Sequence, residues 1–238
     1  MAVSGLAVLP GRLTAVRERI ERACAGAGRA VDEVCLVAVS KRHPVEAIEA
    51  AYAAGQRDFG ENYVQEMRDK LDELKVRGSC PDLRMRFIGH LQRNKAGQVV
   101  ACGCAVDTLD GEKLARALDR RAAEASTTVE VLLQVNIGRE PQKAGVMPED
   151  APALVELVGT LPALRLRGLM AIPPAMVPGQ GGVDDADAAR EHLGRMRELA
   201  RSLSLPELSM GMSADLELAI ECGATMVRVG TDIFGPRP

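Results

Sequence analysis

Residues 35–41 read Cys35-Leu-Val-Ala-Val-Ser-Lys41, a short apolar run that ends in a hydroxyl and a charge. Continuous apolar runs of this length are typical of strands buried on both faces, as in parallel sheets. Seven further runs follow it along the chain. The eight expected strands are Val34–Ser40, Asp58–Gly60, Met85–Gly89, Ala105–Thr108, Val129–Asn136, Leu164–Ala171, Leu208–Gly211 and Met226–Gly230.

Helical patterns separate these runs, and one precedes them. The expected helices are Leu13–Cys24, Pro44–Ala54, Glu61–Arg77, Leu91–Cys102, Glu112–Ala125, Pro148–Thr160, Asp184–Ser204 and Ala214–Glu221. Eight strand–helix repeats predict a single parallel (β/α)8 TIM-type barrel with an extra N-terminal helix. We expect that helix to cover the surface where an eighth helix would otherwise lie. An open doubly wound sheet is the alternative, because a strand count does not establish closure.

Length and composition narrow the class of protein. The chain has 238 residues, and 47% of them are apolar, which is enough for the core of one domain over residues 1–238. We expect Pro173–Val183 to be a mobile loop within that domain. A net charge of −3, with two tyrosines, three phenylalanines and no tryptophan, argues against a nucleic-acid partner. No run is long enough to span a membrane, and no secretory signal is evident. Six cysteines without metal-binding or disulfide spacing indicate a reducing cytoplasm.

Polar residues gather where the expected strands end, which is where barrels of this type carry their chemistry. In chain order these ends are Ser40-Lys41, Gly60-Glu61-Asn62, His90, Asp107-Thr108, Asn136, Met170-Ala171, Ser209–Ser213 and Arg228–Thr231. Glycines and hydroxyls after the seventh and eighth strands predict a phosphate site, with Ser213 capping a helix that begins at Ala214. Each of these residues also suits an ordinary turn or cap, so their convergence on one rim carries the argument.

Lys41 is the most informative of these residues. Its position has the same parity as Val37 and Val39, so its amine enters the barrel mouth if those side chains face inward. A partly desolvated amine beside a phosphate pocket suits a Schiff base with a carbonyl compound. From spacing alone, a solvent-exposed loop lysine is the alternative. Arg228 lies in a short apolar strand, where a guanidinium needs a partner.

Six segments together carry a resemblance to a known family. They are Leu36-Val-Ala-Val-Ser-Lys41, Asp58-Phe-Gly-Glu-Asn62, Arg86-Phe-Ile-Gly-His-Leu-Gln-Arg-Asn-Lys95, Gly168-Leu-Met-Ala-Ile-Pro173, Ser209-Met-Gly-Met-Ser213 and Val227-Arg-Val-Gly-Thr-Asp-Ile-Phe-Gly235. The chain resembles the pyridoxal phosphate homeostasis proteins, a single-barrel group similar to the N-terminal domain of alanine racemase. The match runs in order over nearly the whole chain.

The resemblance implies pyridoxal 5′-phosphate as the cofactor, bound to Lys41 as an internal aldimine. It also assigns the other cofactor-binding residues: Ser213, Gly230 and Thr231 hold the phosphate, Met212 lines that loop, Arg228 faces the pyridine nitrogen, and Asn62 and Asn136 lie around the ring. Asp232 stands where a small residue is expected, and it places a carboxylate near the phosphate loop.

The resemblance leaves a binding protein and an enzyme as the two classes of function. A two-base racemase needs a second acid or base, which alanine racemases take from a tyrosine of an added domain in a partner subunit. Here Tyr52 and Tyr63 fall in helical patterns, and the chain ends at Pro238. We therefore expect a monomeric, non-enzymatic protein of pyridoxal phosphate homeostasis. Its expected partners are the cofactor and the apo-enzymes that use it, with no metal. A Schiff-base aldolase would not explain the full set of motifs.

Overall fold

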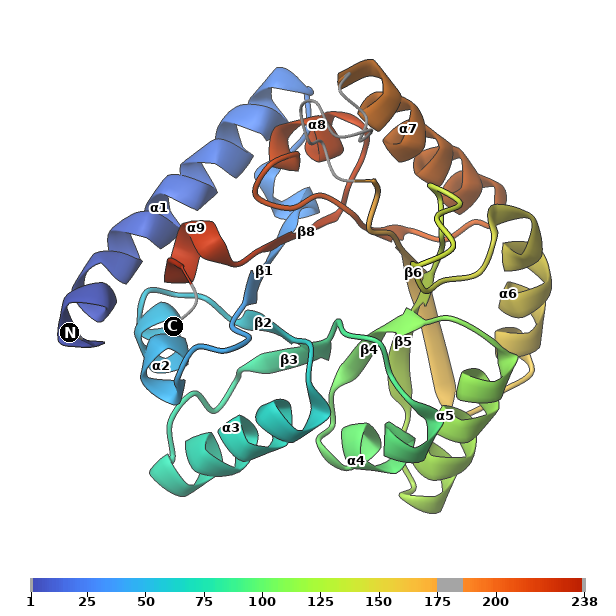
Figure 1. The fold of residues 1–238 in the computed structure, drawn as a ribbon, viewed down its shortest axis with the longest axis horizontal. Coiled ribbons are helices and arrows are strands. Elements are labelled where there is room, and N and C mark those ends of the chain that lie inside the picture. Colours follow the sequence, from blue (N-terminus) through green and yellow to red (C-terminus); the bar gives the residue numbers. More distant parts are fainter. Residues whose placement is uncertain (1, 175–185, 237–238) are drawn as a thin grey trace.

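Eight parallel strands form a closed barrel in the computed structural model, which describes residues 2–174 and 186–236 (Figure 1). The strands are β1 (Cys35–Val39), β2 (Asp58–Glu61), β3 (Arg84–Phe87), β4 (Ala105–Leu109), β5 (Val129–Gln134), β6 (Leu164–Met170), β7 (Glu207–Ser209) and β8 (Met226–Val229). Each strand pairs with the next in the chain. β1 also pairs with β8, with Leu36 opposite Val227, and this pairing closes the barrel. The predicted barrel is confirmed, and the open sheet is wrong.

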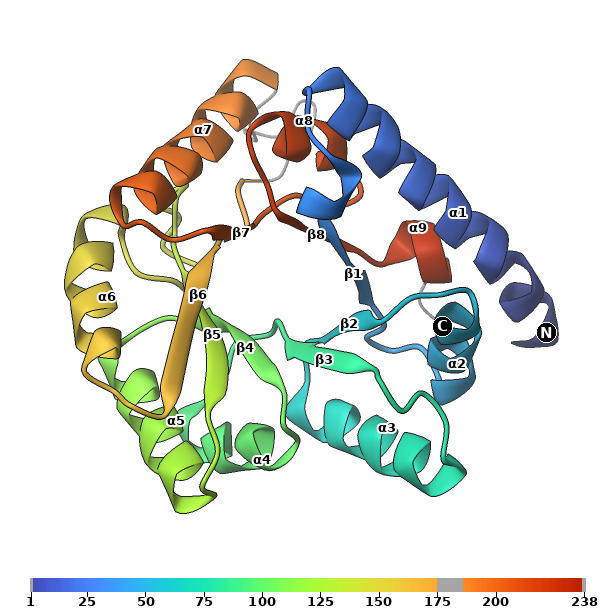
Figure 2. The same ribbon diagram turned by 180° about the vertical axis from the view of Figure 1, so that it is seen from behind.

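Helices surround the barrel on its outer face (Figures 1 and 2). They are α1 (Ala2–Gly26), α2 (Val45–Ala53), α3 (Val64–Arg77), α4 (Ala96–Ala101), α5 (Glu112–Glu124), α6 (Ala151–Gly159), α7 (Ala186–Ser202), α8 (Leu216–Glu221) and α9 (Thr231–Phe234). Short 3-10 turns are η1 (Val31–Glu33), η2 (Arg93–Lys95) and η3 (Pro148–Asp150). Residues 175–185 lie outside the described residues, and they include most of the predicted loop Pro173–Val183 and the start of the predicted helix Asp184–Ser204.

The N-terminal helix α1 packs against α8, α9 and α2 and covers the part of the barrel around β8 and β1 (Figure 2). Its buried stripe is Leu9, Leu13, Val16 and Ile20, at helical spacing. The covering role predicted for this helix is confirmed, but the helix begins at Ala2 and not at Leu13. Packing of its apolar face outweighs the low helix propensity of the one proline and two glycines in its first half.

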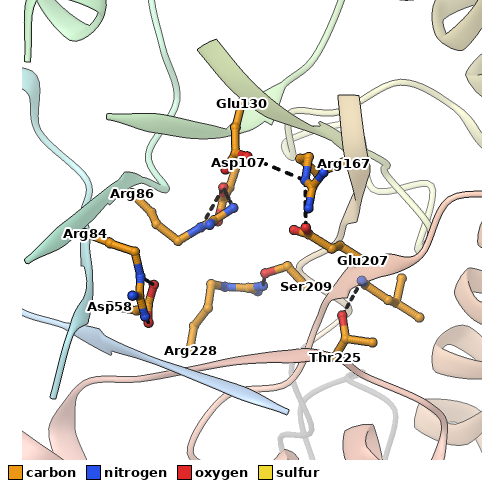
Figure 3. A network of polar contacts seen from close by, with 11 residues as sticks. Asp58, Arg84, Arg86, Asp107, Glu130, Arg167, Glu207, Ser209, Thr225 and Arg228 are labelled. Carbon is orange, nitrogen blue, oxygen red and sulfur yellow. Dashed lines mark hydrogen bonds and ion pairs between the residues drawn. The ribbon is translucent and has the colours of Figure 1, made fainter. Parts of the chain in front are cut away.

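Two polar pairs share the barrel interior with a small apolar cluster of Val37, Leu132, Met170 and Met226. Figure 3 shows Arg86 directed at Asp107, and Arg228 directed at Ser209. The larger apolar core lies between the sheet and the helices. Because the interior is filled in this way, space for a ligand remains at the ends of the strands and not along the barrel axis.

Several element boundaries differ from the prediction, three of them by a change in the type, continuity or start of an element. Glu61 is the last residue of β2, opposite Phe87, and is fully buried, although the sequence pattern places it in the following helix. The expected helix Leu91–Cys102 is divided into η2 and α4. Helix α8 begins at Leu216, after Asp215, so the prediction that Ser213 caps a helix from Ala214 is wrong.

Candidate functional site

A cavity of about 290 Å³ opens at the ends of β1 and β8. Its lining consists of Val39, Lys41, His43, Asn62, Ile88, Ile172, Met212, Ser213, Ala214, Arg228, Gly230 and Thr231. Seven of the eight predicted site residues are in this lining, and Asn136 is the exception. A larger groove of about 1080 Å³ lies elsewhere, between η2 and α5, and contains none of the eight. We therefore take the smaller cavity as the candidate site.

Lys41 follows β1 and reaches the cavity as its parity predicts. Val37 is buried in the barrel interior, while Val39 and Lys41 both line the cavity. Lys41 is partly buried. The next residue, Arg42, has a φ of 63°, so the chain makes a tight turn directly after the lysine.

Arg228 places a buried positive charge at one wall of the cavity. Its side chain donates from Nη1 to Ser209 Oγ at 2.7 Å and from Nη2 to the carbonyl of Ala171 at 2.9 Å. Burial lowers the pKa of the guanidinium. The ordinary pKa of arginine lies so far above neutral pH that the side chain stays charged. The two partners fix its plane, as expected for a guanidinium inside a barrel.

Two loops on neighbouring strands bring hydroxyls to the cavity. Ser213 follows β7, and Thr231 follows β8. The backbone of the two segments is joined, because Arg228 N–H donates to the carbonyl of Gly211 at 3.0 Å. Met212 N–H donates to the Asp215 carboxylate at 2.6 Å, which orders the loop before α8. The two loops therefore present two hydroxyls, together with the backbone of Gly230, to one side of the cavity.

Asp232, which the sequence places beside the phosphate loop, is paired with a residue from the opposite end of the chain. Arg19 of α1 donates from Nη1 to Asp232 Oδ2 at 2.7 Å and from Nη2 to the Ser213 carbonyl at 2.8 Å. It also contacts Glu217 at 2.7 Å. The Asp232 carboxylate is therefore neutralised by an ion pair, and one guanidinium holds both loops.

The two predicted asparagines occupy different places. Asn62 lines the cavity, and its Oδ1 is buried without a hydrogen-bond partner. Asn136 lies in an adjoining cavity of about 230 Å³, which shares Asn62, Ile88 and Ile172 with the first. Its Nδ2 donates to the Glu140 carbonyl at 2.8 Å, and its Oδ1 accepts from Glu140 N–H at 3.1 Å. Asn136 thus braces the loop after β5.

Other strand-end residues that the sequence singles out do not line the main cavity. Asp107 points into the barrel interior, where its carboxylate pairs with Arg86 at 2.8 Å. His90 is largely exposed and lies 3.2 Å from the Asp110 carboxylate. Ile88, Ile172 and His43 line the cavity although the sequence does not single them out. His43 stacks on Phe234 of α9, a helix that the sequence analysis does not predict.

The described part of the chain shows neither a metal site nor a membrane-spanning helix. Residues 2–174 and 186–236 contain no group of His, Cys, Asp and Glu arranged to hold a metal ion. All six cysteines are free thiols. None of the described helices combines the length and apolar character that a membrane crossing requires.

Comparisons with known sequences match nearly the whole chain. Residues 12–238 fit the family model of the alanine racemase N-terminal domain. The pyridoxal phosphate homeostasis protein of Pseudomonas aeruginosa is 43% identical over 236 residues, covering 98% of this chain and 97% of that protein. The protein of the same name from Escherichia coli K12 is 44% identical over 230 residues, covering 94% and 95%.

Solved structures show the same barrel. PipY of Synechococcus elongatus with pyridoxal phosphate bound is 39% identical, with a TM-score of 0.76, covering 91% of this chain and 100% of that one. Alanine racemase from Streptomyces coelicolor is 20% identical, with a TM-score of 0.73, covering 98% of this chain and 59% of the racemase. The likeness to the racemase concerns the fold alone. The chain belongs to the alanine racemase N-terminal domain family and, within it, to the pyridoxal phosphate homeostasis proteins.

Proposed function

We propose that this protein binds pyridoxal 5′-phosphate at the barrel mouth and serves the homeostasis of that cofactor without catalytic turnover. The observation that carries the proposal is the convergence of Lys41, Arg228, Ser213 and Thr231 on one cavity from three separate strands. The names of the relatives and the cofactor bound to PipY support the same ligand.

The donor set of the cavity fits the chemistry of the cofactor. Pyridoxal phosphate carries an aldehyde, a phosphate, a hydroxyl and a pyridine nitrogen. The Lys41 amine suits the aldehyde as an aldimine, and the hydroxyls of Ser213 and Thr231 suit the phosphate. The unpartnered Oδ1 of Asn62 is an acceptor for a ligand donor, and leaving such an atom buried and unpaired costs about 1–3 kcal/mol.

Arg228 favours holding the cofactor over using it. A guanidinium facing the pyridine nitrogen keeps that nitrogen unprotonated, because two positive charges at hydrogen-bond distance repel each other. The ring is then a weaker electron sink than one facing a carboxylate. Both Arg228 partners are neutral groups, so the positive charge is not cancelled by a direct contact.

The tyrosines do not supply a second acid or base to the cavity. Tyr52 donates its hydroxyl to Asp82 and stacks under Arg57, whose guanidinium carbon lies 4.0 Å from the ring centroid. Tyr63 is about half exposed, and neither tyrosine lines the cavity. This placement supports a binding protein over a racemase that uses a tyrosine. We also propose a cytoplasmic location, which the six free thiols suit, and a monomer that delivers the cofactor to apo-enzymes.

Borohydride reduction of the loaded protein tests the proposal. The protein with pyridoxal phosphate is expected to absorb in the visible range, and reduction is expected to fix the cofactor on Lys41. Lys41→Ala should lose the band and the adduct. Lys113→Ala, which changes a lysine of the outer groove, should keep both. Peptide mapping that finds the adduct on another lysine, or no adduct in the parent protein, would refute the assignment.

A further inference from the structure

A buried ion cluster lies directly behind the turn that carries Lys41. Lys70 of α3 is 7% exposed, and Glu61 at the end of β2 is fully buried. Lys70 Nζ donates to Glu61 Oε1 at 2.6 Å, to Glu66 Oε1 at 2.7 Å and to the Ser40 carbonyl at 2.9 Å. An ammonium has three donors, so this one is saturated.

The same cluster holds both neighbours of Lys41. Ser40 Oγ donates to Glu61 Oε1 at 2.7 Å, in addition to the bond that its carbonyl accepts from Lys70. On the other side, Arg42 N–H donates to Glu66 Oε1. Arg42 has left-handed backbone, which costs a non-glycine residue energy unless its surroundings hold it there. The turn at Lys41 is therefore fixed at both ends by Glu61, Lys70 and Glu66.

Stability alone is a poor explanation of this cluster. A buried ion pair loses hydration, and apolar residues of similar size often serve stability equally well. Glu61 is fully buried, so its carboxylate bears this cost. Burial raises the pKa of Glu61, while Lys70 and Ser40 oppose the rise. The Lys70 ammonium contacts the Ser40 carbonyl in the Lys41 turn and the carboxylates of Glu61 and Glu66. Both carboxylates also accept hydrogen bonds from that turn.

We propose that Lys70 and Glu61 are positioning residues that hold the Lys41 amine in the geometry needed to form an imine with an aldehyde ligand. The inference rests on the proposed function. In the step concerned, the amine nitrogen bonds to the aldehyde carbon, and the aldehyde oxygen leaves as water with two hydrogens from the amine. Nothing is oxidised or reduced. The rate of such a step depends steeply on the placement of the nucleophile.

The test compares an aldehyde ligand with a ligand that lacks the aldehyde. The variant is Lys70→Met with Glu61→Gln, which removes both of the most buried charges, keeps a carbonyl oxygen for Ser40 and leaves the partly exposed Glu66 carboxylate bonded to Arg42 N–H. We expect imine formation with pyridoxal phosphate to slow by about tenfold or more. The affinity for pyridoxine 5′-phosphate, an alcohol that forms no imine, should stay within about twofold of the parent value, since the phosphate loops are untouched.

A matched control changes an ion pair at the other end of β2, the strand that ends at Glu61. Asp58→Asn with Arg84→Met removes the pair at the left of Figure 3, in which Arg84 Nε lies 2.9 Å from Asp58 Oδ1. This control should leave both ligands unaffected. Glu66→Gln, which keeps Lys70 paired with Glu61, provides a milder second variant and should slow imine formation in the same direction.

Three results would overturn the inference, and they differ from one another. An unchanged rate in the double variant and in Glu66→Gln would show that the cluster does not position the amine. Equal losses for both ligands would show that it only supports the cavity. Absence of any reducible adduct in the parent protein would instead refute the proposed function, and with it the step that the cluster serves.

Discussion

At the scale of single residues, the proposed phosphate end of the cavity has two hydroxyls from adjacent strands. Ser213 and Thr231 line the cavity together, and the Asp232 carboxylate nearby is occupied by Arg19. A charge-assisted hydrogen bond to a phosphate contributes about 1.5–3 kcal/mol. Because the two hydroxyls come from two different loops, they should contribute to phosphate binding in parallel.

Removing both hydroxyls is expected to weaken pyridoxal phosphate binding more than removing either one. Ser213→Ala and Thr231→Ala should each cost about 1.5–3 kcal/mol of cofactor binding, with Lys41 still reacting at high cofactor concentration. Pyridoxal, which lacks the phosphate, should bind the parent protein poorly and lose little more in the double variant. Titration of both ligands measures this, with Ser202→Ala on the outer helix α7 as the control. Equal losses for the two ligands would mean that the loops shape the mouth and do not bind phosphate.

At the scale of elements, helix α1 does more than cover the barrel. Its Arg19 joins the loop after β7, through the Ser213 carbonyl, to the segment after β8, through Asp232. The partners raise the pKa of Arg19, with the hydrogen bond to Glu217 as the largest cause. The extra helix is thereby connected to the part of the site proposed to hold the phosphate.

Arg19→Met should therefore weaken retention of pyridoxal phosphate without removing the Lys41 adduct. Loss of the loop contacts and exposure of the Asp232 carboxylate to the phosphate should together cost about 1–2 kcal/mol, or about five- to thirtyfold in affinity. Equilibrium dialysis of the cofactor measures the loss. Arg22→Met on the same helix, where the arginine side chain is 68% exposed, should have no effect. Adding Asp232→Ala should restore part of the affinity, and a failure to do so would argue against charge repulsion.

The sequence predicts elements and strand-end residues well because both follow local rules. Alternating apolar runs and helical patterns lead to the barrel, and strand parity places Lys41 in the cavity. Contacts between distant segments have no such local signal. Arg19 and Asp232 are 213 positions apart, and the pattern around Glu61 suits a helix until the register with β3 places it in a strand.

Asn136 illustrates a second limit. The sequence pattern makes it the last residue of the fifth strand, whereas β5 ends at Gln134 and Asn136 braces an irregular loop through Glu140. Such loops follow no periodic pattern. The closing pair of β8 with β1 is likewise a global property, which eight separate strand predictions do not contain. Local patterns thus predict where polar residues stand, while their partners depend on the closed barrel.

At the scale of the whole molecule, the cavity combines Lys41 with surroundings that suit the proposed storage of a ligand. In the proposed complex the Arg228 charge opposes protonation of the pyridine ring, and neither tyrosine lines the cavity. His43 lines the cavity but is stacked on Phe234 with ring centroids 5.2 Å apart, which holds it against α9. The described lining of the cavity therefore contains one amine and no tyrosine.

We accordingly expect no sustained racemase, transaminase or decarboxylase turnover from the loaded protein. Without a tyrosine acid or base in the cavity, and with a ring that is a weak electron sink, conversion should stay far below about 1 s⁻¹. Chiral analysis of the common amino acids, incubated with the loaded protein, measures this against the same concentration of free pyridoxal phosphate. His43→Ala serves as the matched variant, because His43 is the imidazole in the cavity lining. Turnover at about 1 s⁻¹ or above that disappears in Lys41→Ala would establish an enzyme, and its loss in His43→Ala would identify the second base.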